Sequence, residues 1–552
     1  MRSKEKKNGN GVRFEAGKFV GAFAVACALA DLAFGGVNNV KLDTSDDRVE
    51  SPLQVSLKRI GTLRPRSVSE ISGSSWMLGC ETLDRDYMNF DEYKEYIAPM
   101  GIKLVRLQAG WAKTERTKGV YDFGWLDHIV HYLRDRGIGV FLELTYGNPI
   151  YEGAGGWDLG MGLPSSPEGK AAWDRWVDAL TRHYADTVKE WTIWNEPDTG
   201  GLTGKLKDKQ DVVELNVRTA DLVLKNIPDA KISLFNLAYI NLGYLEDLLK
   251  LTPRSTFAKC HSISYHDYQV QPEATYPKLE AARKLLKKYG ADNLILRQTE
   301  NGCPSEMAIL FAMNKIAWSE YSQAKWYLRR MMGDLGHDVP GSVFTLSEFN
   351  HRANKFRSAE INHKGLIRIN ENREVIGIKR AYYAVQNVVS VFDDTLTRVK
   401  GPADVQRVFS RKGELDAAKP GEKPLVSIAD LTVSHFEYET RDGDRVLVFW
   451  DHGDVVRHPI LKEGAKGDVL ELNPDTSDRL ALRPGDSFVT RPIAFDYAGK
   501  PFADPVWVDL LTGRVYEFPK KDMLVHSAGV TFVNVPLYDS PCLLAERRAV
   551  MR

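Results

Sequence analysis

The chain has 552 residues, and 43% of them are apolar, which is enough to form large hydrophobic cores. A chain of this length exceeds one ordinary domain, so two domains are expected. Lys and Arg together number 74, as do Asp and Glu, and this balance gives no indication of a nucleic-acid partner or of an anionic membrane surface.

The first 37 residues have the features of a secretory signal peptide. Six Lys and Arg residues lie within residues 1–18, ahead of an apolar run over residues 19–30 that is too short to span a bilayer comfortably. We therefore predict that residues 1–37 are removed and that the mature protein is secreted or periplasmic, with no stable membrane span. The alternatives are a lipid anchor on Cys27 and an uncleaved anchor.

Four cysteines remain after this cleavage, namely Cys80, Cys260, Cys303 and Cys542. Four in a chain of this size do not make a disulfide framework, although an oxidising compartment allows an isolated bridge. Plain buried thiols are the expected state.

A polar segment at 38–70, with scattered Pro and Arg, is expected to be a linker or a wrapping arm, and residues 71–394 then alternate short apolar runs with helical periods. The predicted strands are 76–80, 103–108, 140–145, 191–194, 232–236, 262–265, 294–299 and 343–347. The helical segments include 125–136, 171–185, 211–226, 276–289, 308–336 and 375–392. This alternation predicts an α/β fold, a closed parallel (β/α)8 TIM barrel. An open doubly wound sheet is the alternative, but GCET at 79–82 lacks the spacing of a phosphate-binding glycine turn.

The segment 190–201, EWTIWNEPDTGG, is predicted to be a buried strand that delivers Asn195, Glu196 and Pro197 onto a turn. A carboxylic acid held partly desolvated at a barrel rim can donate a proton near neutral pH. Asn195 offers both a donor and an acceptor to a hydroxyl group. The tripeptide alone is weak evidence, and its position after WTIW gives it weight.

The strand that ends in Trp-Asn-Glu-Pro resembles the fourth barrel strand of clan A glycoside hydrolases. The resemblance implies that Glu196 is the acid/base and that a second carboxylate ends the seventh strand. LILRQTENG at 294–302 supplies Glu300 there, in a form similar to the nucleophile strand of glycoside hydrolase family 39. A closed barrel places all strand carboxyl ends on one face, so the two carboxylates are expected to converge.

Three more strand ends carry candidate substrate-binding residues. Arg106 in VRLQ resembles the clan A arginine that orients the nucleophile, and it would also suit a purely structural salt bridge. His266 and Tyr268 in SISYHDY resemble the imidazole and phenol groups that the family places beside the nucleophile. Glu348 in TLSEFN is expected to contact substrate hydroxyls, at a strand end where many clan members have Trp.

The loop at 147–169 is long and rich in Gly, and loops of this kind on the carboxyl-end face of a barrel usually shape the pocket. Trp157 and Tyr151 in this loop are candidates for stacking on a sugar ring. The alternative for Trp157 is that it fixes the loop to the barrel.

From residue 395 to 552, alternating segments separated by Asp-Gly, Thr-Gly and Pro turns predict an antiparallel β-sandwich domain. With the resemblance, the chain is expected to be a retaining glycoside hydrolase that cleaves β-glycosidic bonds of a carbohydrate substrate. No metal or cofactor is expected, because two carboxylates supply the acid and the nucleophile. A β-xylosidase-like or an endo-glycanase activity, the oligomeric state, and a non-catalytic carbohydrate-binding barrel as another class all remain open.

Overall fold

The computed structural model describes residues 40–159, 161–200, 206–308, 311–351, 361–400, 405–409, 433–453 and 488–552. The predicted signal peptide, including Cys27, lies outside these residues. Within the described part of the chain, no helix is both long and apolar enough to cross a membrane. Cys80, Cys260, Cys303 and Cys542 are all buried free thiols.

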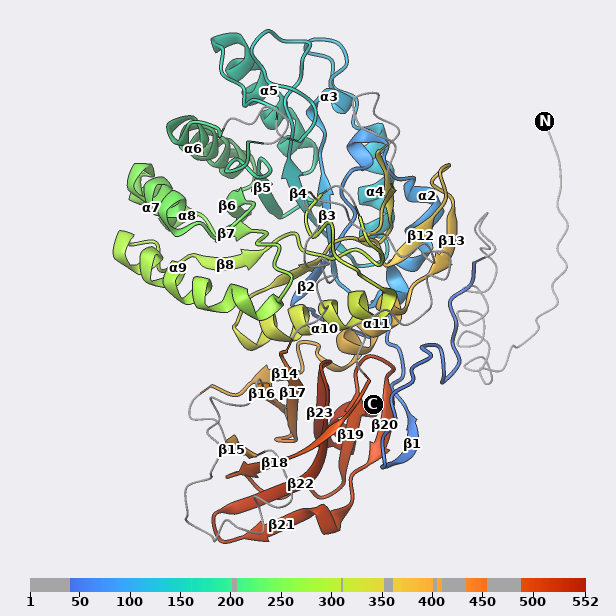
Figure 1. The fold of residues 1–552 in the computed structure, drawn as a ribbon. Coiled ribbons are helices and arrows are strands. Elements are labelled where there is room, and N and C mark those ends of the chain that lie inside the picture. Colours follow the sequence, from blue (N-terminus) through green and yellow to red (C-terminus); the bar gives the residue numbers. More distant parts are fainter. Residues whose placement is uncertain are drawn as a thin grey trace, which may run out of the picture.

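Eight parallel strands form a closed barrel, as predicted (Figure 1). In spatial order they run β8-β7-β6-β5-β4-β3-β2-β9, and β9 pairs with β2. The ring closes between β8 and β9, where the amide of Gln298 donates to the carbonyl of Pro340 at 3.0 Å. The strands are β2 (Trp76–Gly79), β3 (Leu104–Gln108), β4 (Gly139–Leu144), β5 (Glu190–Ile193), β6 (Lys231–Leu237), β7 (Ser262–Tyr265), β8 (Ile295–Gln298) and β9 (Gly341–Val343).

Helices cover the outside of the barrel because each presents one apolar face to the strands. In α5 that face includes Trp173, Trp176 and Leu180, which are spaced for one side of a helix and are buried. Ser166 caps its start by accepting a hydrogen bond from the amide of Gly169 at 2.9 Å. The helices are α2 (Phe90–Tyr93), α3 (Trp111–Thr114), α4 (Gly124–Arg134), α5 (Pro167–His183), α6 (Lys209–Asn226), α7 (Leu242–Leu251), α8 (Arg254–Lys259), α9 (Tyr276–Tyr289), α10 (Glu320–Gly336) and α11 (Arg380–Val391).

Two predicted helices are shorter than expected. The helix predicted at 308–336 begins only at Glu320, because Ser319 and Ser322 form a reciprocal cap there. The first part of the helix predicted at 375–392 is instead strand β13 (Val375–Ile378), which pairs with β12 (Ile367–Ile369). The β-branched residues of this segment favour a strand once a partner is available. A second small hairpin joins β10 (Phe349–Asn350) to β11 (Ile361–Asn362).

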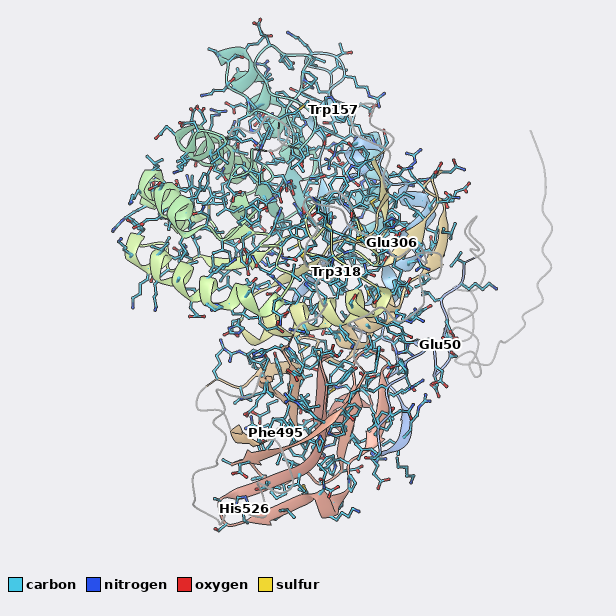
Figure 2. All side chains as sticks on the ribbon, viewed as in Figure 1. Glu50, Trp157, Glu306, Trp318, Phe495 and His526 are labelled. Carbon is cyan, nitrogen blue, oxygen red and sulfur yellow. The ribbon has the colours of Figure 1, made fainter. Side chains whose placement is uncertain are left out.

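The described part of the C-terminal domain contains two antiparallel sheets, in the orders β1-β20-β19-β23-β17-β16-β14, where β1 is Lys58–Thr62, and β15-β18-β22-β21. Figure 2 labels Phe495, a buried residue in this domain. The domain's strands are β14 (Leu396–Arg398), β15 (Val405–Phe409), β16 (Val433–Thr440), β17 (Arg445–Asp451), β18 (Arg491–Tyr497), β19 (Pro505–Asp509), β20 (Arg514–Glu517), β21 (Met523–His526), β22 (Gly529–Leu537) and β23 (Cys542–Glu546), followed by helix α13 (Arg547–Val550).

The larger sheet is apolar on both faces. Along β17, Val446, Val448 and Trp450 belong to the core that is continuous with the barrel, whereas Leu447 and Phe449 belong to the core between the two sheets. Successive side chains of a strand point to opposite faces, so one strand serves two cores. Helices α10 and α11 lie between the barrel and this sheet (Figure 1).

The segment predicted as a linker or wrapping arm contains β1 (Lys58–Thr62). This strand pairs antiparallel with β20 at the edge of the larger C-terminal sheet. Earlier in the same segment, Arg48 donates to the side chain of Asn387 in α11 at 2.6 Å. The arm therefore contacts the last barrel helix and also completes the sheet of the C-terminal domain.

Candidate active site

A cavity of about 360 Å³ opens at the carboxyl-end face of the barrel. Residues at or just after the carboxyl ends of all eight barrel strands line it. Parallel barrel strands converge their ends on one face, so groups far apart in sequence meet there. The cavity wall includes both predicted carboxylates, Glu196 and Glu300.

The turn after β5 directs Glu196 toward the cavity. The strand ends at Ile193, and both Trp194 and Glu196 then adopt left-handed backbone conformations, with φ of 63° and 48°. Such conformations are unfavourable for bulky residues and persist only where the surroundings hold them. Here the amide of Glu196 donates to the carbonyl of Asn236, at the end of the next strand, at 3.0 Å. The side chain of Glu196 is 14% exposed.

Glu300 follows β8 and accepts hydrogen bonds on both carboxylate oxygens. Arg106 donates to Oε2 at 2.7 Å, and the hydroxyl of Tyr268 donates to Oε1 at 2.8 Å. Burial alone would raise the pKa of Glu300, but the charges of His266 and Arg106 and these hydrogen bonds lower it to about 2. Glu300 is therefore an ionised carboxylate, 13% exposed, at the cavity wall.

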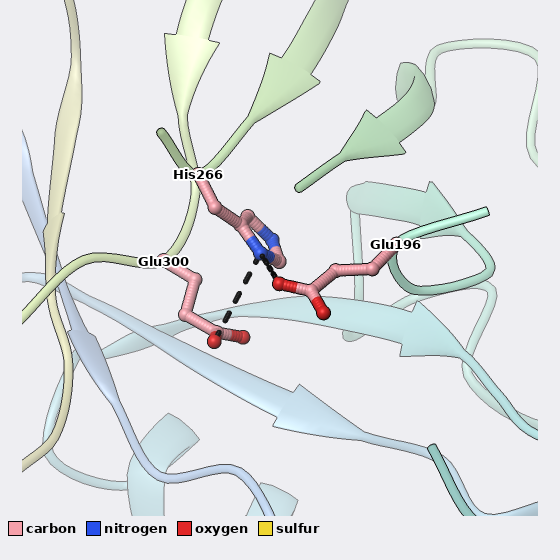
Figure 3. A group of neighbouring side chains, drawn as sticks. All are labelled: Glu196, His266 and Glu300. Atoms are coloured by element: carbon pink, nitrogen blue, oxygen red, sulfur yellow. Dashed lines mark hydrogen bonds and ion pairs between the residues drawn. The ribbon is translucent and has the colours of Figure 1, made fainter. Parts of the chain in front are cut away.

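His266 lies between the two carboxylates (Figure 3). Its Nδ1 is 2.8 Å from Oε1 of Glu196 and 3.9 Å from Oε1 of Glu300, and its Nε2 is 3.3 Å from the side-chain oxygen of Asn236. Burial lowers the pKa of His266, but Glu300 and Glu196 outweigh burial and raise it overall. Glu196, His266 and Glu300 each offer a ligand atom within 4.8 Å of the others, so the two carboxylates are close neighbours.

Arg106 lies wholly buried in β3 and connects several of these groups. Its Nη1 donates to Glu300 and also to Oε1 of Glu81 at 2.8 Å. Its Nη2 donates to the side-chain oxygen of Asn195 at 3.0 Å and contacts Glu143. Asn195 therefore helps to orient the guanidinium of Arg106.

Sequence reasoning missed Glu81, Glu143 and Asn236. Glu143 stands in the apolar strand FLELT, and a lone charge in a buried strand is a signal for a buried ion pair. Glu81 follows β2 by two residues, which is the type of position that led to Glu300. Asn236 accepts a hydrogen bond from Thr299 at 2.7 Å, and no sequence motif marks it.

The aromatic residues predicted to stack on a sugar do not line the cavity. Tyr151 is buried, donates to Glu115 at 2.5 Å and stacks on Trp111. Trp157, labelled in Figure 2, is half-buried and is not among the residues that line the cavity. The Gly-rich loop folds back on itself, with the amide of Gly147 donating to the carbonyl of Gly156 at 2.8 Å. The loop contributes Leu159 to the cavity wall in place of Trp157.

Glu348 also differs from its predicted role, because it is 1% exposed and is not part of the cavity wall. Lys379 contacts its Oε1 at 2.6 Å, and Nδ1 of His363 contacts the same oxygen at 2.9 Å. The amide of Ile369 donates to Oε2 at 3.2 Å. Glu348 therefore joins the loop after β9 to the β12–β13 hairpin and to the start of α11.

Tyr239 is an aromatic residue at the cavity wall that no sequence motif marks. It follows β6 and is 51% exposed. Its amide and that of Ala238 donate to the carboxylate of Asp198, at 3.2 Å and 2.7 Å, and Asp198 lies two residues beyond Glu196. Tyr239 is thus fixed beside the loop that carries Glu196.

Comparisons with known proteins agree with this fold. A family model described as Glyco_hydro_42, β-galactosidase, matches residues 85–149, which include Arg106 but neither Glu196 nor Glu300. A comparison with curated proteins finds no match.

Solved structures resemble the chain over most of its length. A family 39 glycoside hydrolase from Bacteroides cellulosilyticus WH2 is 15% identical, with a TM-score of 0.57, and the match covers 90% of this chain and 85% of that one. The family 39 enzyme from Xanthomonas axonopodis pv. citri is 16% identical, with a TM-score of 0.51 and coverage of 88% and 95%. A monomeric β-xylosidase from Caulobacter crescentus CB15 is 14% identical, with a TM-score of 0.50 and coverage of 88% and 97%. The chain therefore has the fold of clan A glycoside hydrolases, similar to that of family 39, as the Trp-Asn-Glu-Pro and Thr-Glu motifs predicted.

Proposed function

We propose that this protein is a retaining glycoside hydrolase that cleaves β-glycosidic bonds of a carbohydrate substrate in the barrel cavity. The observation that carries the proposal is the closeness of the Glu196 and Glu300 carboxylates, which have oxygens within 4.8 Å of each other. Retaining enzymes hold their two carboxyl groups about 5–5.5 Å apart, whereas inverting enzymes need about 6.5–9.5 Å for an intervening water.

In the first half-reaction, a carboxylate oxygen of Glu300 attacks the anomeric carbon while the glycosidic C–O bond breaks. Glu196 gives its proton to the departing oxygen. The low pKa of Glu300, about 2, keeps this nucleophile ionised across the pH range in which the protein is expected to work. Arg106 and Tyr268 fix both of its oxygens, so the carboxylate is oriented before the sugar arrives.

In the second half-reaction, Glu196 removes a proton from a water molecule, and the water oxygen attacks the anomeric carbon. The ester bond to Glu300 breaks and its carboxylate is restored. His266 contacts Glu196 at 2.8 Å and Asn236 at 3.3 Å, so it holds Glu196 on the cavity side through both steps. The same three groups, Glu196, His266 and Glu300, are near enough to ligate a metal ion, but this reaction uses them for proton transfer and nucleophilic attack.

The test is hydrolysis of aryl β-glycosides and a panel of polysaccharides, with proton NMR of the first sugar anomer released. We expect the β-anomer to appear first and to mutarotate afterwards. First release of the α-anomer would contradict the double displacement, and no hydrolysis of any substrate would favour a non-catalytic carbohydrate-binding barrel. Product lengths from polysaccharides separate a β-xylosidase-like activity from an endo-glycanase.

We also propose that the protein acts outside the cytoplasm, after loss of residues 1–37. The basic start and short apolar run support this proposal. Intact-mass measurement of protein recovered from the periplasm or the medium is expected to lack the first thirty-odd residues. A full-length mass in the cytosol would contradict the proposal, and a lipid mass on Cys27 would replace it with the anchored alternative.

A further inference from the structure

Three carboxyl groups, two of them buried and the third at the cavity wall, share the single guanidinium of Arg106. Nη1 donates to both Glu81 and Glu300, at 2.8 Å and 2.7 Å, and Nη2 contacts Glu143. Arg106, Glu81 and Glu143 are at most 1% exposed. Arg106 and the nearby His266 bring at most two positive charges to a poorly solvated site that holds these three carboxyl groups and Glu196, so the carboxyl groups are not expected to be ionised together.

The hydrogen bonds distinguish these carboxyl groups from one another. Both oxygens of Glu300 accept hydrogen bonds, and so do both oxygens of Glu143, from Arg106 and from Gln108 at 3.2 Å. This is the pattern of a carboxylate, which is an acceptor only. Glu81 differs, because its Oε1 accepts from Arg106 while its Oε2 is buried with no hydrogen-bond partner among the described residues.

Burying a carboxylate oxygen that has no hydrogen-bond donor costs free energy. A proton on that oxygen removes the negative charge that causes this cost. Glu81 interacts electrostatically with Arg106, Glu143 and Glu300. Its charge also affects four other titratable groups, namely Cys80, Tyr93, Tyr268 and Tyr327. Burial raises the pKa of each of these thiol and phenol groups well above its usual range, so they stay neutral.

Burial likewise raises the pKa of Glu81, to about 8 against an ordinary value of 4.5. Arg106 and a hydrogen bond from the backbone amide of Glu81 itself oppose this rise, and the charges of Glu300 and Glu143 add to it. Burial raises the pKa of Glu143 as well, but both of its oxygens have donors; of the three carboxyl groups around Arg106, Glu81 alone has an oxygen with no hydrogen-bond partner among the described residues.

We propose that Glu81 is a neutral carboxylic acid in the resting protein and acts as a positioning residue. It shares Nη1 of Arg106 with Glu300 but, being neutral, does not compete with Glu300 for the positive charge of Arg106. The role in positioning a nucleophile rests on the proposed function, whereas the protonation state does not. When Glu81 loses its proton at alkaline pH, it becomes a second anion on the same nitrogen. The hold of Arg106 on Glu300 then weakens, and activity falls.

The first experiment measures thermal unfolding of the wild type, E81Q and E143Q against pH, and it needs no substrate. Folding raises the pKa of Glu81, so its contribution to stability is greatest at low pH and is lost as pH rises from about 4.5 to about 8. Gln has the shape of the neutral acid and does not titrate. The melting temperature of E81Q minus that of the wild type is therefore expected to increase between about pH 5 and about pH 8.

E143Q is the matched control, because it changes another carboxyl partner of the same arginine. A Gln at 143 turns an N–H group toward Arg106 or Gln108, so this variant is expected to melt below the wild type at every pH. The proposal would be overturned if the melting temperature of E81Q minus that of the wild type stayed constant or decreased as the pH rises. It would also be overturned if the loss of melting temperature in E81Q were as large as that in E143Q throughout the range.

The second experiment follows glycosylation in the E196A background with an activated aryl glycoside, which needs no proton donor. The alkaline decline of the single-turnover rate is expected to move to higher pH when E81Q is added. An identical decline in E196A and in E81Q/E196A would contradict the positioning role. If no variant shows glycosidase activity, the proposed function fails, and the melting experiment still decides the state of Glu81.

Discussion

Glu300, which is mostly buried, and Glu348, which is fully buried, are two carboxylates that follow neighbouring barrel strands, β8 and β9. Burial opposes ionisation at both positions, yet nearby cations lower the pKa of each to about 2. The difference lies in access and in charge balance. Glu300 is 13% exposed at the cavity wall, shares Arg106 with two other carboxyl groups and shares His266 with Glu196. Glu348 is 1% exposed and has two cationic partners, Lys379 and His363.

This comparison shows that a shifted pKa does not by itself mark a reactive group. Ion pairs that only hold a scaffold together lower a carboxyl pKa as far as an active site does. The features that set Glu300 apart are a surplus of carboxyl groups over cations and an oxygen surface that a substrate can reach. Substitution of Glu300 is therefore expected to reduce activity much more than stability, and substitution of Glu348 is expected to reduce stability much more than activity.

The largest effect is expected for Glu300→Gln, which removes the carboxylate proposed as the nucleophile and keeps its shape. Turnover of activated and unactivated glycosides is expected to fall by at least about 10⁴-fold, because no glycosyl-enzyme can form. Steady-state assays measure this, and circular dichroism with thermal melting shows whether the protein still folds. A folded variant with wild-type rates would end the assignment of Glu300.

The next largest effect is expected for Glu196→Ala, and it depends on the leaving group. Substrates with poor leaving groups are expected to lose about 10²–10⁴-fold, whereas activated aryl glycosides still form the glycosyl-enzyme. Added azide, which needs no base, is expected to restore turnover and yield a glycosyl azide of retained configuration. An inverted azide product, or equal losses on both substrate types without an azide effect, would remove Glu196 from this role.

Glu348→Gln is expected to reduce stability much more than chemistry. Breaking a buried ion pair by removing one partner costs about 3–5 kcal/mol, while kcat of the folded variant should stay within about threefold of the wild type. The pKa of Glu348 falls from 4.5 to about 2 on folding, so its stabilisation is present above about pH 4.5 and is lost as the pH falls toward 2. The stability gap between wild type and variant, from urea unfolding at several pH values, should narrow on acidification. A large loss of kcat with normal stability would place Glu348 in the active site after all.

The smallest effect is expected for Tyr239→Ala, at the exposed aromatic residue beside the Glu196 loop. We expect this ring to pack on the leaving-group sugar, so its loss should raise KM for oligosaccharides by about fivefold, equivalent to about 1 kcal/mol. A glycosyl fluoride has no leaving-group sugar and should be unaffected, and Tyr239→Phe should behave like the wild type. Equal changes on the fluoride and on oligosaccharides would mean that Tyr239 does not contact the leaving group.

The barrel and the two facing carboxylates were predictable because their signals are local. A run of apolar residues that ends in Asn-Glu-Pro or in Thr-Glu before a turn specifies a strand end with a carboxylate on it. Glu348 shares that pattern, and its different role depends on Lys379 and His363, which reach it from the α11 start and from the segment before β12.

The other features that were not predicted from the sequence also depend on contacts between distant parts of the chain. Glu81 and Glu143 lie 25 and 37 residues from Arg106, and nothing in either segment shows that they meet it. Residues 375–378 have β-branched residues that suit a strand, but they form one because a partner strand is available at 367–369, and the segment itself does not show that partner. A sequence pattern thus identifies where a carboxylate emerges but not how many cations surround it.

The antiparallel pairing of β1 with β20 has a consequence for the order in which the protein can assemble. Lys58 and Glu517, which face each other across this pair, are separated by 459 residues. Contacts between such distant parts of a chain form late and slow the completion of folding. The barrel strands are all synthesised before β20, so the arm must wait unpaired until almost the entire chain is available. During synthesis, this unpaired strand is open to proteases and to chaperones that bind extended chains.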